Sequence, residues 1–345
     1  MFGANGVDLF FVLSGFLITG ILFDSISDSG YFRKFYARRT LRIFPLYYGV
    51  LFVLFLLTPL IGLQWHRMNW ALLCYLQNTN TFGTFYTLQL GHGLSLDHFW
   101  SLAVEEQFYL VWPFAVSLIR DLRKLIWVCC SLSFVALLLR FVLIFHHTNY
   151  NFINRSTFSR ADTLLFGAVL ALLLRSHLRD AVLASAEKIF FGVVAVVVSL
   201  NILRFFIERH SGWLFGFDGS YLAIRYTLIA LGSAALIASC LRPSSRFRTF
   251  FEGRTLRFFG KYSYGLYVLH YAAAGFFIAT FRSWILHFTS NKLIGVVAAG
   301  FLTFLVAIIL AYVSYNLYEK QFLRLKRYFD YDRSGAPEAP SHAPH

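Results

Sequence analysis

The chain has 345 residues, of which 58% are hydrophobic, 19% are aromatic and only 14% are charged. Polar side chains this scarce could not cover the surface of a water-soluble protein, so the composition excludes a soluble globular enzyme and favours helices embedded in lipid. The formal net charge of +14 would suggest a nucleic-acid ligand in a soluble chain. In a membrane protein its distribution between loops matters more than its sum, and we expect no nucleic-acid partner.

Nine apolar runs are long enough to cross a bilayer as helices, for which about 20 residues are needed. They cover residues 6–25, 44–63, 99–119, 125–145, 159–174, 188–207, 220–241, 260–281 and 292–317. The predicted fold is therefore all-α, a polytopic transmembrane helix bundle whose first partner is the lipid bilayer. The four cysteines lie in apolar runs without the spacing of metal ligands, so we expect no metal site.

The basic residues divide the loops into two sets. Most Lys and Arg lie in residues 26–43, 120–124, 175–188, 242–261 and 318–333, whereas Arg67, Arg155, Arg209 and Arg282 stand alone in the alternate loops. By the positive-inside rule the first set is cytoplasmic, which predicts a multi-pass protein of the inner (plasma) membrane with a cytoplasmic C-terminus. The alternation holds only if residues 64–98 begin and end outside, so the stretch 69–85 is predicted to be re-entrant or interfacial.

The same alternation of cytoplasmic and outer loops makes the first span run from the outside to the inside, although only Met1–Asn5 precede it. The run lacks the basic region and the cleavage site of a signal peptide. We therefore expect that one upstream span is missing and that residues 1–329 form an N-terminally incomplete membrane domain. Residues 330–345 are rich in Pro, Ala and Ser and are predicted to be a disordered tail. The sequence does not indicate an oligomeric state.

Two adjacent carboxylates, Glu105 and Glu106, lie in the otherwise apolar and aromatic run 97–113. An ionised carboxylate at mid-bilayer costs roughly 2.5 to 3.5 kcal/mol on insertion scales, so such residues usually face protein or a wet cavity. In a helix, Ser101, Glu105 and Tyr109 share one face. The alternative is a helix that begins at the water interface, with both acids exposed and an aromatic residue of the interfacial belt beside them.

Other polar residues are open to two interpretations each. Asp8, near the outer end of the first run, either caps a helix or faces a site. His98 is the imidazole nearest to Glu105 in sequence and is either a base or a hydrogen-bonded bystander. His270, inside an apolar run, needs a hydrogen-bond partner and is either a structural link or a pore-facing group. Glu319, beside Lys320, favours a salt-bridged helix end.

Six blocks of the sequence resemble, in order, those of the acyltransferase-3 family of membrane O-acyltransferases. They are GVDLFFVLSGFLIT at 6–19, FRKFYARRTLRIFPLYY at 32–48, HFWSLAVEEQFYLVWP at 98–113, SRADTLLFGAVLA at 159–171, GKYSYGLYVLHY at 260–271 and NLYEKQFLRL at 316–325. The resemblance implies a helix bundle that transfers acyl groups, often acetyl from acetyl-CoA, to hydroxyl groups of carbohydrates, peptidoglycan or small natural products. It also implies a first helix with a basic residue and a catalytic His, and this is the span that the alternation of the loops leads us to expect is missing here.

The resemblance also implies roles for individual residues. The converging guanidinium groups of Arg38, Arg39 and Arg42 would bind the phosphates of an acyl-CoA donor substrate, most simply acetyl-CoA, although they could instead meet anionic lipid headgroups. No other cofactor is expected. The residues expected to act in catalysis are Glu105, Asp8 and His98, with Asp8 orienting the missing His. The residues expected on the acceptor side are Trp100, Arg160 and Asp162.

The sequence therefore predicts an O-acyltransferase that moves an acyl group from a cytoplasmic acyl-CoA to a hydroxyl of an extracytoplasmic carbohydrate or related acceptor. One alternative is an inactive or mis-started fragment of such an enzyme. The other is a membrane transporter, which would also explain charges inside the membrane but would commonly show inverted repeats, and the sequence has none.

Overall fold

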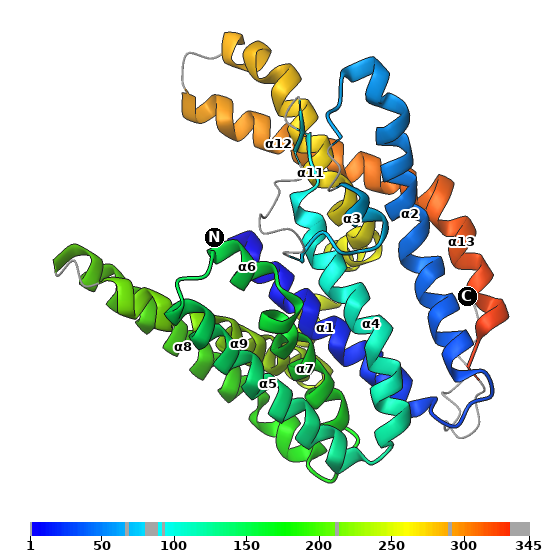
Figure 1. The fold of residues 1–345 in the computed structure, drawn as a ribbon, viewed down its shortest axis with the longest axis vertical. Coiled ribbons are helices and arrows are strands. Elements are labelled where there is room, and N and C mark those ends of the chain that lie inside the picture. Colours follow the sequence, from blue (N-terminus) through cyan, green and yellow to red (C-terminus); the bar gives the residue numbers. More distant parts are fainter. Residues whose placement is uncertain are drawn as a thin grey trace.

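The computed structural model describes residues 2–65, 69–79, 89–91, 94–210, 214–288 and 292–331 (Figure 1). Its long helices are α1 (Phe2–Asp24), α2 (Tyr31–Ile61), α4 (Trp100–Ile119), α5 (Leu122–Phe145), α7 (Thr157–Leu173), α8 (Arg179–His210), α9 (Leu214–Leu241), α11 (Arg254–Phe288) and α12 (Lys292–Ser314). Shorter elements connect them: α3 (Trp70–Leu73), the antiparallel strands β1 (Gln89–Gly91) and β2 (Leu94–Ser95), η2 (Asp97–Phe99), α6 (Tyr150–Arg155), α10 (Arg246–Phe251), the π-helical turn η3 (Tyr315–Glu319), α13 (Lys320–Arg324) and η4 (Leu325–Phe329).

Eight helical segments in the described part of the chain are long and apolar enough to cross a membrane. They coincide with eight of the nine expected runs, and the remaining run, 260–281, lies within α11. The prediction of an all-α polytopic membrane bundle is therefore confirmed. The side chains of α11 beyond residue 271 lie outside the described residues.

Helix α2 differs from its prediction because it begins at Tyr31 rather than at residue 44. Gly30 and Gly62 bound it with φ angles of 73° and 62°, a left-handed conformation that glycine adopts without strain. The basic residues 33–42 therefore form the first turns of a membrane helix instead of a loop. Their side chains follow the helical register and face fixed neighbours.

The helices form two groups that meet at α4 (Figure 1). In the first group α1 packs against α7, α7 also contacts α5 and α9, and α8 pairs with α9. In the second group α11 pairs with α12, while α2 contacts η3, α13 and η4. Helix α4 packs on α1 and α7 of the first group.

Side chains of α2 reach α4 across the boundary between the two groups. The Tyr31 hydroxyl donates to the carbonyl of Pro113 at 3.3 Å, and the Tyr36 hydroxyl donates to that of Leu110 at 2.8 Å. Further along α2, the Tyr47 ring lies 5.0 Å from that of Phe99. The start of α2 therefore meets the end of α4, and the two helices run antiparallel.

Close backbone approach fixes α1 on α7. A Cβ atom placed on Gly15 would lie 1.9 Å from the carbonyl oxygen of Leu164, and one on Gly167 would lie 2.0 Å from that of Val12. Only glycine fits at both positions, as expected where small residues let membrane helices touch. This close contact holds in place the helix that carries Asp8 and Ser14.

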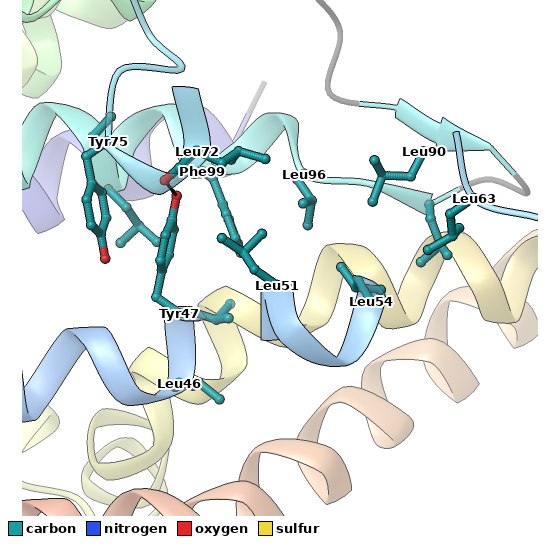
Figure 2. Packing of buried hydrophobic residues seen from close by; sticks show 14 residues of the cluster. Leu46, Tyr47, Leu51, Leu54, Leu63, Leu72, Tyr75, Leu90, Leu96 and Phe99 are labelled. Atoms are coloured by element: carbon teal, nitrogen blue, oxygen red, sulfur yellow. Dashed lines mark hydrogen bonds between the residues drawn. The ribbon is translucent and has the colours of Figure 1, made fainter. Parts of the chain in front are cut away.

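The segment 69–79 has the irregular backbone expected of the predicted re-entrant stretch, with one short helix, α3, followed by turns. The Tyr47 hydroxyl donates to Leu72 O at 2.8 Å, and Gln107 Nε2 donates to Tyr75 O at 2.7 Å. Figure 2 shows Tyr47 and Tyr75 side by side in this packing, with ring centroids 4.3 Å apart. Protein side chains therefore cover this backbone, which is what a re-entrant segment would need. Residues 80–85 of the predicted stretch lie outside the described residues.

Candidate functional site

Glu105 lies in the second turn of α4, where it faces α1. Its carboxylate is 3% exposed and accepts hydrogen bonds from the hydroxyls of Ser14 and Tyr109. The positive charges of Arg39 and Arg42 also act on it. The interpretation of an exposed interfacial acid is therefore wrong for Glu105, which is held inside the protein by two hydroxyl donors.

Glu106 points to another side of the same helix, toward a group of tyrosines. Its charge acts on Tyr47 and Tyr75, and Arg39 is the cation that acts on its carboxylate. The Oε1 atom of Glu106 is buried and has no hydrogen-bond partner among the described residues. The two neighbouring carboxylates thus face different environments, as the rotation of about 100° per helical residue predicts.

Arg38, Arg39 and Arg42, the three arginines of α2 predicted to bind phosphates, have different surroundings. The Arg38 guanidinium donates to the carbonyl of Phe329 at 3.3 Å and to the Asp330 carboxylate at 2.5 Å. The Arg39 guanidinium lies 5.5 Å from the centroid of the Tyr109 ring. Tyr109 follows Glu105 by one turn of α4. Arg42 is exposed. The three side chains are brought to one end of the bundle, but Arg38 is occupied by the C-terminal segment.

The first two residues of the predicted disordered tail, Asp330 and Tyr331, contact Arg38. Asp330 pairs with Arg38, and the Tyr331 ring lies 5.3 Å from the Arg38 guanidinium carbon. Burial raises the pKa of the Tyr331 hydroxyl, while the charges of Arg39 and Arg38 act in the opposite direction. Residues 332–345 lie outside the described residues.

His98 lies at the opposite end of α4, packed against α11. Its Nε2 lies 3.4 Å from the carbonyl oxygen of Val268, and its ring is 5.2 Å from that of His270. A carbonyl can only accept, so the proton of the neutral ring resides on Nε2 and a lone pair remains on Nδ1. In the described part of the protein this buried Nδ1 has no hydrogen-bond partner. The arrangement leaves a nitrogen that can accept a proton.

Two hydroxyls continue this polar region toward Glu105. The Tyr267 hydroxyl donates to the carbonyl of His98 at 2.5 Å and contacts the Ser101 hydroxyl. His270 uses Nδ1 to donate to the carbonyl of Tyr267 at 2.8 Å, so its Nε2 also keeps a lone pair. The predicted face of Ser101, Glu105 and Tyr109 is thus polar along its length, although Ser101 bonds to α11 and not to Glu105.

Asp8 forms a buried ion pair with Arg160 of α7, and each side chain is 1% exposed. The Arg160 guanidinium carbon lies 3.9 Å from the centroid of the Tyr226 ring. Its Nε and Nη1 atoms are buried and have no partner among the residues that the structure describes. Trp100 lies close by, with its ring 6.0 Å from that of Phe11.

Asp162 does not pair with Arg160, although the two are neighbours in sequence. It forms a bidentate pair with Arg140 of α5, with distances of 2.9 and 2.6 Å, and both side chains are fully buried. Arg140 also donates to the carbonyl of Ala223 at 2.9 Å, and Thr227 donates to Asp162 at 2.8 Å. This closed network joins α5, α7 and α9.

Glu319 ends the π-helical turn η3 and is 8% exposed. It accepts a hydrogen bond from Ser314 at 3.0 Å, and a Cβ on Gly265 would lie 3.1 Å from its Oε1. The predicted salt bridge at this helix end is not among the described ion pairs; the charge of Arg42 acts on the Glu319 carboxylate instead. Glu319 therefore belongs to the arginine end of the bundle.

The structure brings the predicted residues together in two sets. Glu105 lies between Arg39 on one side and Ser101 and His98 further along α4, whereas Asp8 and Arg160 form a separate pair beside Trp100. Tyr109 of α4 and Tyr267 of α11 add hydroxyl groups to the polar face of α4. The spacing of Tyr109 from Glu105 indicated the first, but nothing in the sequence singled out Tyr267. Among the described residues, no cluster of His, Cys, Asp and Glu could hold a metal ion.

These features define a class of protein, a polytopic membrane protein with charged and hydroxyl side chains buried along a central helix. The chain belongs to the acyltransferase-3 family: the family model described as "Acyltransferase domain" matches residues 1–312.

Similar proteins include two named O-acetyltransferase OatA, from Staphylococcus aureus strain NCTC 8325 / PS 47 and from strain COL. Each is 30% identical over 295 residues, a region that covers 78% of this chain and 45% of the relative. The chain thus spans about half the length of the relatives that it matches. No solved structure matches the chain.

Proposed function

We propose that the protein transfers an acyl group, most simply acetyl, from a cytoplasmic acyl-CoA to a hydroxyl group of an extracytoplasmic carbohydrate. The observation that carries this proposal is a row of polar side chains along α4. Arg39 of α2 lies beside Tyr109 at one end of the row, Glu105 follows, and His98 of η2 lies at the other end. Buried charged and hydroxyl groups are expensive inside a membrane, so a continuous row of them marks a path for substrates. Membership of the acyltransferase-3 family supports the same chemistry.

The donor would bind at the arginine end. Arg39 and Arg42 have no ion-pair partner among the described pairs, and guanidinium groups suit phosphate oxygens. Arg38 would act indirectly, because it holds the C-terminal segment beside them. A coenzyme A thioester cannot cross a bilayer, so the arginine end would be cytoplasmic, as would the C-terminus.

His98 would be the base. Its Nδ1 lone pair would take the proton of the acceptor hydroxyl while the hydroxyl oxygen attacks the thioester carbonyl carbon. A C–O bond forms, the C–S bond breaks, and the leaving thiolate takes up a proton to become the free coenzyme thiol. Glu105 would position Ser14 and Tyr109 along the path rather than remove the proton.

The acceptor side would include Trp100, whose ring offers an apolar face to a sugar, and Arg160, whose Nε and Nη1 atoms are available as donors. Asp8 would hold Arg160 in place. We assign Asp162 a structural role, since its carboxylate is already used by Arg140 and Thr227.

The test is transfer of radiolabelled acetyl groups from acetyl-CoA in membranes that contain the wild type or Glu105→Gln. The wild type should form an alkali-labile ester of a glycan. Glu105→Gln should be slower by roughly tenfold, because it weakens two hydrogen bonds to a charged acceptor, and Glu252→Gln, at an exposed carboxylate, is the control. Absence of ester in the wild type would contradict the proposal.

A further inference from the structure

The proposed base, His98, packs against a second histidine. The ring centroid of His270, on α11, lies 5.2 Å from that of His98 at an interplanar angle of 66°. Ring nitrogens that face each other at this spacing come within hydrogen-bond reach, about 2.7 to 3.2 Å. The Tyr271 ring stacks on His98 at 5.1 Å, and the Tyr267 ring lies 5.3 Å from it. One turn of α11 therefore places two tyrosines and a second imidazole against His98.

Backbone carbonyls fix which nitrogen of each ring carries the proton. His98 donates through Nε2 to the Val268 carbonyl at 3.4 Å, and His270 donates through Nδ1 to the Tyr267 carbonyl at 2.8 Å. A neutral imidazole has one donor and one acceptor nitrogen, so the lone pairs are on Nδ1 of His98 and Nε2 of His270. Two acceptors cannot hydrogen-bond to each other, but one added proton can bridge them as N–H···N. The pair is thus arranged to hold one extra proton.

The described surroundings of His98 offer no carboxylate that pairs with its ring. In the Ser-His-Asp arrangement a carboxylate orients the histidine and stabilises the imidazolium that forms. Here the neighbouring Asp97 lies 3.8 Å from Arg155, and Glu105 accepts from two hydroxyls about two turns further along α4. The described contacts of the His98 ring are a carbonyl and aromatic rings. The second imidazole is therefore the described group that can take over a positive charge from His98.

The exposure of the two histidines gives the proton a direction. His98 is 9% exposed, whereas His270 is half-buried, and the Tyr271 side chain that contacts both rings is 45% exposed. A positive charge costs more free energy in the more buried ring. A proton that bridges the pair is therefore drawn from His98 to His270.

We propose that His270 takes over the proton that His98 removes from the acceptor hydroxyl, and so restores the base for the next turnover. While the acceptor is bound, its hydroxyl donates to Nδ1 of His98. After acyl transfer its oxygen is an ester oxygen, a weak acceptor, so the new Nδ1–H is free to turn to His270. The N–H bond at Nδ1 of His98 breaks, an N–H bond forms at Nε2 of His270, and water removes the proton from there. His98 returns to its starting tautomer with its proton on Nε2.

The inference rests on the proposed function, in which His98 is the base. His270 acts through His98 and touches neither donor nor acceptor. Its step follows the chemistry, so loss of His270 should slow repeated turnover and leave the first transfer unchanged. A residue that only supports the structure would slow both.

The experiment follows acetyl-ester formation by rapid quench and in the steady state. It uses the full-length protein in lipid nanodiscs with radiolabelled acetyl-CoA and a soluble glycan. The variant is His270→Asn, because the Asn amide nitrogen takes the place of Nδ1 and still donates to the Tyr267 carbonyl, while nothing replaces Nε2.

In His270→Asn the first ester per protein should form at the wild-type rate. Later turnovers should be slower by roughly tenfold, which is less than the loss of a general base itself, because water still removes the proton without His270. Imidazole added to the buffer should restore the later turnovers. The control is His177→Asn, at an exposed position, which should leave both phases unchanged.

Three results would overturn the inference: equal slowing of the first and later turnovers in His270→Asn, unchanged later turnovers, or no restoration by imidazole. If His270→Asn does not fold, His270→Gln makes the same test, since its amide also has no nitrogen that accepts a proton.

The outcome separates this inference from the proposed function. If the wild type forms ester, His98→Gln is impaired and His270→Asn turns over like the wild type, only the role of His270 fails. If the wild type forms no ester at all, the proposed function fails and the role of His270 fails with it.

Discussion

At the scale of single residues, His98 combines burial with a ring nitrogen that has no protein partner among the described residues. His98→Gln should lower kcat for acetyl transfer about 100-fold, because general base catalysis typically contributes at least that much. KM for acetyl-CoA should change little, since the ring lies far along α4 from Arg39. The control is His146→Gln, at an exposed position. Full activity in steady-state assays of His98→Gln would remove His98 from the mechanism.

Substitution of Arg140 is expected to destabilise the protein strongly, since its bidentate partner Asp162 is fully buried. Arg140→Ala should lower the free energy of unfolding by about 3 to 5 kcal/mol because it leaves a buried charge unpaired. Arg248→Ala, which breaks an exposed pair with Glu252, should change it by no more than about 1 kcal/mol. Thermal unfolding in detergent measures both.

The double substitution Arg140→Met with Asp162→Leu separates pairing from packing. It removes both charges together and should be less destabilising than Arg140→Ala alone. A double variant that unfolds at a lower temperature than the single one would contradict this explanation.

The partners of these buried charges could not be predicted from the sequence. Arg160 and Asp162 are two residues apart, and residues at that spacing do not face each other on a helix. Arg160 therefore pairs with Asp8 of α1, while Asp162 pairs with Arg140 of α5. In contrast, the spacing of Glu105 and Tyr109 by four residues predicted a shared face, and the Tyr109 hydroxyl does bond to Glu105.

At the scale of elements, the contact between α1 and α7 depends on Gly15 and Gly167. Gly15→Leu should destabilise the protein by at least about 1 to 3 kcal/mol, because the side chain must displace backbone atoms of α7. Gly192→Ala, where no atom lies within 4 Å of the added Cβ, should be neutral or stabilise by up to about 1 kcal/mol. Unfolding temperatures of the two variants in the same detergent test this, and equal values would contradict the close contact.

The spans themselves were predictable because an apolar run of bilayer length has few other structures available to it. The start of α2 was not predictable, because a hydropathy pattern indicates where the lipid-exposed part of a chain begins and not where its helix begins. Its first turns carry arginines that extend the helix beyond the apolar run. Likewise, the ion pair of Asp330 with Arg38 could not be predicted, because the two residues are distant in sequence.

At the scale of the whole molecule, two helix groups meet at α4, and the polar residues of the proposed reaction lie along that helix. The composition predicted the membrane bundle, and the acidic run predicted where polar groups would be buried. The helical rotation predicts that Glu105 and Glu106 point to different sides of α4. Which helices they face could not be predicted, because that depends on the placement of α1 and α2 on either side of α4.

The central claim is that acyl groups pass along α4 from the arginine end to a hydroxyl on the other side of the membrane. The most direct measurement uses sealed proteoliposomes of defined protein orientation, with radiolabelled acetyl-CoA on one side and a soluble glycan on the other. Acetyl ester should form on the glycan only when acetyl-CoA is on the side of Arg39 and Arg42, and Arg39→Ala should reduce the rate. Label that crosses without forming an ester, or transfer that is equal from both sides, would contradict the account.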